Sequence, residues 1–152
     1  MKQSLTAWLV CFFSLLCVAG NDIPLEQVRQ GYQNAVSDKD ECLRLIEELQ
    51  AHVEQPVYLA YLGGLQSIRA QHVFNPISKY NTFKDGRRNI ERAVAMDPDN
   101  LEIRFVRLSI QQHLPMFLNY RQNIPEDQAL LKEHIQEIDS KELRSMVHRL
   151  LN

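Results

Sequence analysis

The chain has 152 residues, of which 45% are hydrophobic and 24% are charged, and its formal net charge is −2. This length is typical of one domain, and the composition is typical of a globular protein with a buried core. The near balance of charge argues against a nucleic-acid-binding surface, which would normally show a clear basic excess.

The N-terminus has the pattern of a secretory signal peptide. Lys2 supplies a short positive region, residues 5–18 are almost entirely apolar, and Ala19-Gly20-Asn21 follows. We expect residues 1–20 to be removed, with cleavage after Gly20 or Ala19, so that residues 21–152 are exported to the periplasm or cell exterior without a membrane span. Two alternatives stay open, a retained N-terminal anchor helix and lipidation at Cys17.

The cysteine positions predict a free thiol. Cys11 and Cys17 lie within the signal peptide, which leaves Cys42 without a partner for an internal disulfide. Because Cys42 is in phase with Ile46 and Leu49 on a helix, we expect its thiol to be buried.

Two amphipathic helices begin the exported region. Pro24 suits the first turn of a helix that extends to about residue 37. Asp38 and Glu41 have the spacing of a capping box that opens a second helix, which runs to about residue 53. The short corner between them predicts an antiparallel helix pair.

A third helix, residues 57–72, is apolar nearly all round and is therefore predicted to be central. Gly63-Gly64 in its middle indicates the close approach of a neighbouring helix. Residues 73–81 contain Asn75-Pro76, which we interpret as the end of the helix, so we expect an ordered loop packed on the helices. Thr82 is the predicted N-cap of a fourth helix, residues 83–96.

The sharpest corner lies between the fourth helix and a fifth one, residues 100–113. The fourth helix cannot run past Met96, because Pro98 disfavours helical backbone at Asp97. Asp99 is the predicted N-cap of the fifth helix, and Glu102 completes a capping box.

This corner resembles the tetratricopeptide repeat family. In that family a repeat closes with a small residue, an apolar residue, an alanine and a proline at fixed spacing. The same spacing is present here in Gly86, Ile90, Ala93 and Pro98. Residues 97–100 resemble the linker of the family, and an aromatic, a leucine and a small residue open the next repeat one position late (Phe105, Leu108 and Ser109). Leu62-Gly63 resembles the pair that begins the earlier repeat, with an insertion before the second helix. The resemblance covers residues 56–112 and implies antiparallel helix pairs in a short right-handed stack with a peptide-binding groove.

The C-terminal third predicts an apolar loop and two more helices. Residues 116–120 form the loop, Pro125 opens the sixth helix, and Ser140 caps the seventh. About seven helices and no convincing strand give an all-α fold over residues 21–152. The large hydrophobic residues of both apolar loops would mark an interface if exposed. We favour burial against the core for this set: Phe74, Ile77, Tyr80, Phe117 and Tyr120.

No catalytic or metal-binding motif is present. The five histidines lack ligand spacing, and His134 has no second histidine four residues away. A site formed in three dimensions by His72 and His113 stays an alternative. Phosphate loops, nucleophile elbows and cysteine–histidine signatures are absent from the sequence. The sequence therefore predicts no catalytic residue, no metal and no cofactor.

The best candidate site in the sequence is the polar face of the fifth helix, formed by Arg104, Arg107 and Gln111. In one interpretation this face lines a groove and binds a carboxylate or an acidic peptide, for which guanidinium groups are suited. In the other, the arginines pair with acidic residues of a neighbouring helix. Tyr58 and Tyr61 could add groove contacts or belong to the core.

These features favour an exported, non-enzymatic scaffold or adaptor that binds a protein or a peptide. A helical stack offers an extended surface without supplying catalytic groups. One alternative is a small hydrolase-type or metal-dependent enzyme with a site dispersed over several helices. Another is a helical subunit of an envelope complex, which would expose a large apolar face.

Overall fold

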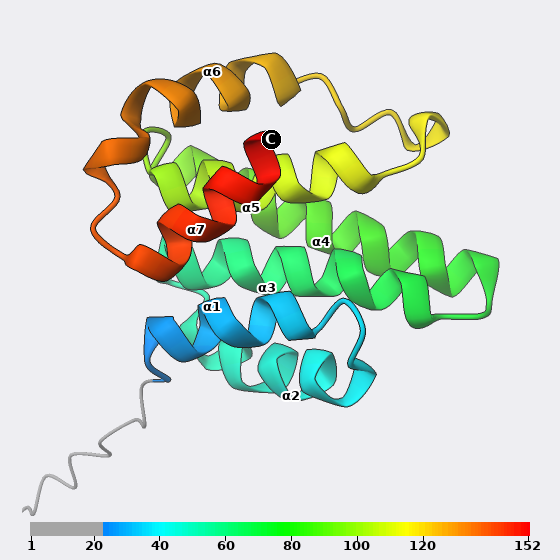
Figure 1. Ribbon diagram of the computed structural model, residues 1–152. Helices are drawn as coiled ribbons and strands as arrows, with labels where there is room; N and C mark the ends of the chain where they lie inside the picture. Colours follow the sequence, from blue (N-terminus) through cyan, green and yellow to red (C-terminus); the bar gives the residue numbers. More distant parts are fainter. Residues whose placement is uncertain (1–22) are drawn as a thin grey trace, which may run out of the picture.

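The computed structural model describes residues 23–152, and the predicted signal peptide lies outside them. Within this range the fold is all-α, with seven α-helices and no strand, as the sequence predicted (Figure 1). The helices are α1 (Leu25–Asn34), α2 (Lys39–Leu49), α3 (Pro56–Arg69), α4 (Pro76–Met96), α5 (Leu101–His113), α6 (Ile124–His134) and α7 (Lys141–Leu151). None of these helices is long and apolar enough to cross a membrane.

Four short 3₁₀ segments extend or link the helices. η1 (Gln50–His52) continues α2, and η2 (Ala70–His72) continues α3. η3 (Met116–Leu118) lies between α5 and α6, and η4 (Ile135–Glu137) continues α6. The second and third helices therefore end close to their predicted limits.

α3 is the central helix, and it packs against α1, α2, α4 and α5 (Figure 1). Its two glycines allow this packing. A Cβ atom at Gly63 would lie 2.5 Å from the carbonyl oxygen of Gly86 on α4, and one at Gly64 would lie 2.8 Å from the ring of Tyr32. The predicted close approach is therefore confirmed, with α4 on one side of α3 and α1 on the other.

Of the two contacts predicted to cap α2, the one made by Asp38 is confirmed. The Asp38 carboxylate accepts hydrogen bonds from the backbone N–H groups of Asp40 and Glu41, both at 3.0 Å. The Glu41 side chain does not complete a capping box, because its carboxylate accepts from Arg44 instead. At α7 the predicted cap is present, since Ser140 accepts from the backbone N–H of Leu143.

The predicted cap of α5 is wrong by one residue. Asn100, and not Asp99, accepts from the backbone N–H groups of Glu102 and Ile103. The Asn100 amide also donates to the Asp97 carboxylate, so the Asn100 side chain contacts residues on both sides of the corner. Glu102 does not complete a capping box, because its carboxylate binds Arg29 of α1.

The predicted loop over residues 73–81 is also wrong, because α4 begins at Pro76. Asn75 is its N-cap and accepts from the backbone N–H groups of Ile77 and Ser78. Proline is compatible with the first helical position, where its missing N–H would have no helical acceptor. Thr82 lies inside the helix and donates to the Ser78 carbonyl. Residues 76–81, in the extra turns at the start of α4, are all exposed.

Cys42 is fully buried as a free thiol, as the sequence predicted. Its Sγ lies 3.4 Å from the Leu65 carbonyl, and burial raises the pKa of the thiol to about 11. Because only the thiolate is nucleophilic, we expect iodoacetamide to label native Cys42 at pH 8 more than about 100-fold more slowly than in concentrated urea. Mass spectrometry of the Cys42 peptide measures both rates. Equal rates would show that the thiol is accessible in the folded protein.

Candidate binding site

The candidate face on α5 lies against α6. Arg107 makes a two-point contact with Asp127, from Nε to Oδ2 and from Nη2 to Oδ1, both at 2.7 Å. Arg104 donates to the same carboxylate at 2.9 Å and to Glu126 at 2.7 Å. Asp127 is completely buried, and both arginines are less than 10% exposed.

Gln111 lies in the same interface between α5 and α6. It is fully buried, and its amide nitrogen donates to Asn123 at 3.2 Å, while its Oε1 has no hydrogen-bond partner among residues 23–152. The structure thus brings Arg104, Arg107 and Gln111 together, and it shows the arginines paired with acidic residues of a neighbouring helix. Their role in binding a partner stays a prediction.

A second buried polar cluster joins α1, α3 and α5. Glu102 accepts from Arg29 Nε at 2.8 Å, from Arg29 Nη2 at 2.7 Å and from the Tyr61 hydroxyl at 2.7 Å. Burial and the adjacent Glu102 carboxylate raise the pKa of Tyr61 well above its usual value, so it is a neutral donor. Tyr61 therefore belongs to the core, and Tyr58 is half-buried with its hydroxyl on the Ile23 carbonyl. No local sequence pattern predicts this cluster, because its members are far apart along the chain.

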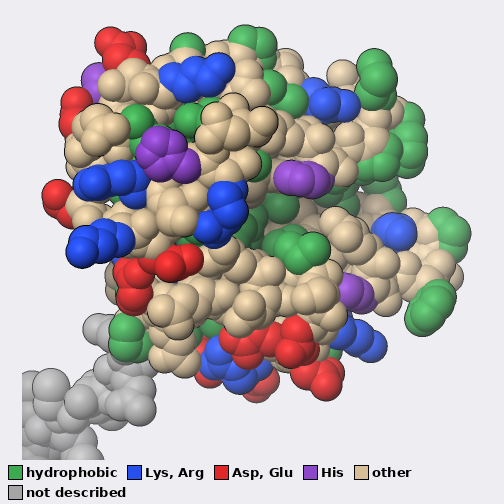
Figure 2. Space-filling view, in the orientation of Figure 1, with side chains coloured by type: hydrophobic (Ala, Val, Ile, Leu, Met, Phe, Trp, Pro, Cys, Tyr) green, Lys and Arg blue, Asp and Glu red, His purple; other side chains and the backbone are tan. Residues whose placement is uncertain are grey.

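Large hydrophobic side chains are exposed at the end of the molecule that carries both the α3–α4 turn and the α5–α6 connection (Figures 1 and 2). We call this surface the apolar end and define it by five exposed residues: Phe74, Ile77, Tyr80, Met116 and Phe117. Phe74 is fully exposed, and Met116 and Phe117 are more than 80% exposed. Among the described residues only two other large hydrophobic side chains are exposed, Val36 and Met96. The predicted burial of the large hydrophobic residues of the two loops is therefore wrong, except at Tyr120.

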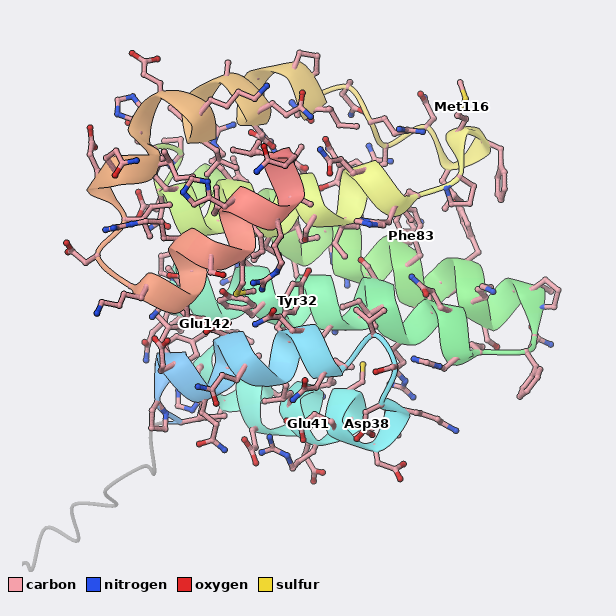
Figure 3. All side chains as sticks on the ribbon, viewed as in Figure 1. Tyr32, Asp38, Glu41, Phe83, Met116 and Glu142 are labelled. Carbon is pink, nitrogen blue, oxygen red and sulfur yellow. The ribbon has the colours of Figure 1, made fainter. Side chains whose placement is uncertain are left out.

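A pocket of about 500 Å³ opens within the apolar end. Phe83, almost fully buried, lies in it, and Figure 3 shows Phe83 below Met116 at this end. Residues of α3, η2, α4, α5 and η3 line the pocket, namely Ser67, Ala70, Gln71, Pro76, Lys79, Tyr80, Phe83, His113, Leu114, Pro115, Phe117 and Leu118. The lining is mainly apolar and combines segments that are far apart in sequence.

The buried side chain of Tyr120 makes several contacts beneath the apolar end. Its ring packs edge to face on Phe83, with 6.2 Å between centroids, and the Arg87 guanidinium lies 4.7 Å above the same ring. Its hydroxyl donates to Glu91 at 2.5 Å, and burial raises its pKa well above the usual value. Asn119 adopts a left-handed backbone conformation (φ 47°), which asparagine tolerates, and it turns the chain from exposed η3 to buried Tyr120. These contacts attach the chain just after η3 to α4.

The histidines give no cluster that would hold a metal ion. Over residues 23–152 no group of three or more His, Cys, Asp or Glu side chains is placed to bind one. His113 lines the pocket, and its Nδ1 lies 2.7 Å from the Ser109 carbonyl. The buried Nε2 of His72 has no hydrogen-bond partner in the described region.

Comparison with known proteins adds no family to this description. No protein family, curated protein or solved structure is matched by the chain. The chain is therefore identified by its fold alone, as an all-α domain of seven packed helices over the residues that the structure describes.

Proposed function

We propose that this protein is an exported, non-enzymatic scaffold or adaptor, and that the apolar end binds its protein or peptide partner. The observation that supports this proposal most strongly is the exposure of five large hydrophobic side chains at one end of the molecule, two of which, Tyr80 and Phe117, line a pocket. Soluble monomers rarely leave contiguous apolar surface in water unless it is used for binding. The burial of Arg104 and Arg107 favours the apolar end over their face of α5 as the contact surface.

The position of the apolar end supports the same proposal. The exposed residues come from both sides of the pocket, Phe74, Ile77 and Tyr80 from the α3–α4 region and Met116 and Phe117 from η3. Their backbone is held by the N-cap at Asn75 and by Tyr120. A preformed surface loses little conformational entropy when a partner binds, which favours affinity.

The chemistry of the pocket favours binding over catalysis. Its titratable lining residues are Lys79, Tyr80 and His113, and no carboxylate lines it. A hydrolase site needs converging groups in acid, base or nucleophile roles within hydrogen-bond reach of one another. We therefore rank the dispersed enzyme site below the binding module.

We further propose that the helical stack is of the tetratricopeptide type. Ile90 and Ala93, which match family positions, are fully buried, and Gly86 meets Gly63 at the closest approach of α3 and α4. Small residues at such positions let the paired helices of a repeat pack closely. The seventh helix would then close the stack.

Capture from an extract of the native organism tests the binding function, with the protein purified after expression of the full chain as bait. We expect a partner that wild type retains and that the double variant Phe74→Ser/Phe117→Ser retains at least tenfold less. Each truncated aromatic anchor typically costs about 2 kcal/mol of binding free energy.

The matched control is Val36→Ser/Met96→Ser, which removes two exposed hydrophobic side chains outside the apolar end. This variant should retain the partner at the wild-type level. Equal capture by all three proteins would contradict the apolar end as the binding surface. A partner that co-purifies in fixed ratio and cannot be removed without aggregation would instead favour the subunit of an envelope complex.

A further inference from the structure

The apolar end is bordered by basic side chains, although the chain as a whole is slightly acidic. Residues 69–90 and 113–123 contain the whole apolar end and only one acidic residue, Asp85. The same two segments contain six lysines and arginines: Arg69, Lys79, Lys84, Arg87, Arg88 and Arg121. Since the full chain carries −2, these two segments carry net positive charge and the remainder of the sequence carries net negative charge. Lys79 lines the pocket and Arg87 lies over the Tyr120 ring. The local field therefore attracts an acidic partner.

Two of these basic groups, Lys79 and Lys84, have no ion-pair or hydrogen-bond partner in the part of the chain that the structure describes. Asp85 is paired with Arg88 at 2.9 Å, and Arg87 lies over Tyr120. Lys79 also lines the pocket, so its side chain borders the apolar surface. A carboxylate bound beside Lys79 would not have to displace an internal acid.

The apolar surface is larger than the pocket, which limits the size of the occupant. Phe74, Ile77 and Met116 are exposed but do not line the pocket. A small molecule inside the pocket would leave these three side chains in water. An occupant that covers the whole apolar end must therefore extend beyond the pocket.

The shape and charge of the surface favour a peptide segment over a lipid surface or a second copy of this chain. A lipid surface is flat and would not fill a recess of about 500 Å³, whereas one large side chain can enter it. A second copy of this chain in a two-fold dimer would bring the same basic patch against itself, with like-charge repulsion. An acidic peptide satisfies the charge, the recess and the extended apolar surface together.

We infer that the apolar end binds an acidic peptide segment of the partner protein. One large apolar side chain of the segment occupies the pocket beside Phe83, and flanking Asp or Glu residues lie beside Lys79 and its basic neighbours. The inference rests on the proposed function and adds the chemical class of the partner.

Selection from a phage library of random 12-residue peptides tests the inference, with the purified protein immobilised. We expect the enriched peptides to share a Phe, Trp, Leu or Met next to two or more acidic residues. Fluorescence anisotropy of a synthetic consensus peptide then gives affinities for variants. Tyr80→Ser/Phe117→Ser should weaken binding at least tenfold. Lys79→Glu should weaken it about tenfold, because one attraction becomes a repulsion.

Lys132→Glu is the matched control for charge, since Lys132 is an exposed lysine on α6. We expect its affinity to differ from wild type by less than twofold. Binding should also weaken when sodium chloride is raised from 50 to 500 mM, because salt screens exposed charge pairs. Circular dichroism confirms that each variant is folded before its affinity is compared.

The outcomes of these binding experiments distinguish a failure of the acidic-peptide inference from a failure of the proposed binding function. Neutral or basic consensus peptides that need Tyr80 and Phe117 would overturn the acidic class while the binding function stands. Acidic peptides that bind the Tyr80→Ser/Phe117→Ser variant equally well would overturn the apolar end as the site of both. No enriched peptide, together with binding to vesicles of phosphatidylcholine and phosphatidylglycerol (3:1), would overturn the peptide in favour of a membrane.

Discussion

Asp127→Ala is expected to lower the free energy of unfolding by about 3 to 5 kcal/mol. The substitution leaves Arg104 and Arg107 buried between α5 and α6 without the carboxylate that now accepts three of their hydrogen bonds. Desolvated charges without a partner are among the most costly defects in a folded protein. Urea unfolding followed by circular dichroism measures the change.

Glu126→Ala is the matched control, because the neighbouring Glu126 also binds Arg104 at 2.7 Å but its side chain is 59% exposed. Water screens this pair, so we expect a loss below about 1 kcal/mol. Similar losses for both variants would show that the burial of Asp127 has no energetic importance. A triple variant, Arg104→Met/Arg107→Met/Asp127→Leu, should recover most of the stability, since it removes all three buried charges together.

Gly86→Ala is expected to destabilise the protein by about 3 kcal/mol, although alanine is the better helix former by about 1 kcal/mol. The new Cβ atom would lie 2.5 Å from the Gly63 carbonyl oxygen and 2.9 Å from the Ser67 backbone nitrogen. Neither atom can move without displacing α3, the central helix. Urea unfolding measures the loss of stability. Helix propensity alone would predict a gain in stability instead.

Gly31→Ala, on α1, provides the control for this argument. A Cβ atom there would also be crowded, at 2.6 Å, but the nearest atoms are the ends of the Glu41 and Leu45 side chains. Side chains can change rotamer, so we expect a loss below about 1 kcal/mol. If Gly31→Ala and Gly86→Ala destabilise equally, backbone contact between α3 and α4 is not the cause.

Local signals in the sequence determined the helical class and most helix positions. Asp38 and Ser140 mark helix starts by accepting hydrogen bonds from backbone N–H groups two or three positions later. Pro56 marks a start because its fixed backbone angle and missing N–H suit the first helical position. The glycines of α3 predicted a close helix approach because a missing side chain has few other uses inside an apolar helix. Their partners on α1 and α4 were not predictable.

Two local sequence patterns are compatible with more than one helix boundary, and neighbouring side chains decide which boundary forms. Asn75-Pro76 is compatible with the end of one helix or the start of the next, and the structure uses it as a start. Asp99 and Asn100 are both good caps, and the contact between Asn100 and Asp97 accompanies the use of the second. In each case the local pattern predicted a corner but not the residue that caps the next helix.

The tertiary structure alone decided which polar and apolar residues reach water. The spacing of Arg104 and Arg107 placed them on one face of α5, but only the packing of α6 shows that Asp127, about twenty positions later, receives both. Phe74 and Phe117 are as apolar as core residues, yet no helix covers them. Helix periodicity is a local property of the chain, whereas burial depends on which distant segments pack together. The sequence therefore determined the helices of this protein, and the packing determined its candidate binding surface.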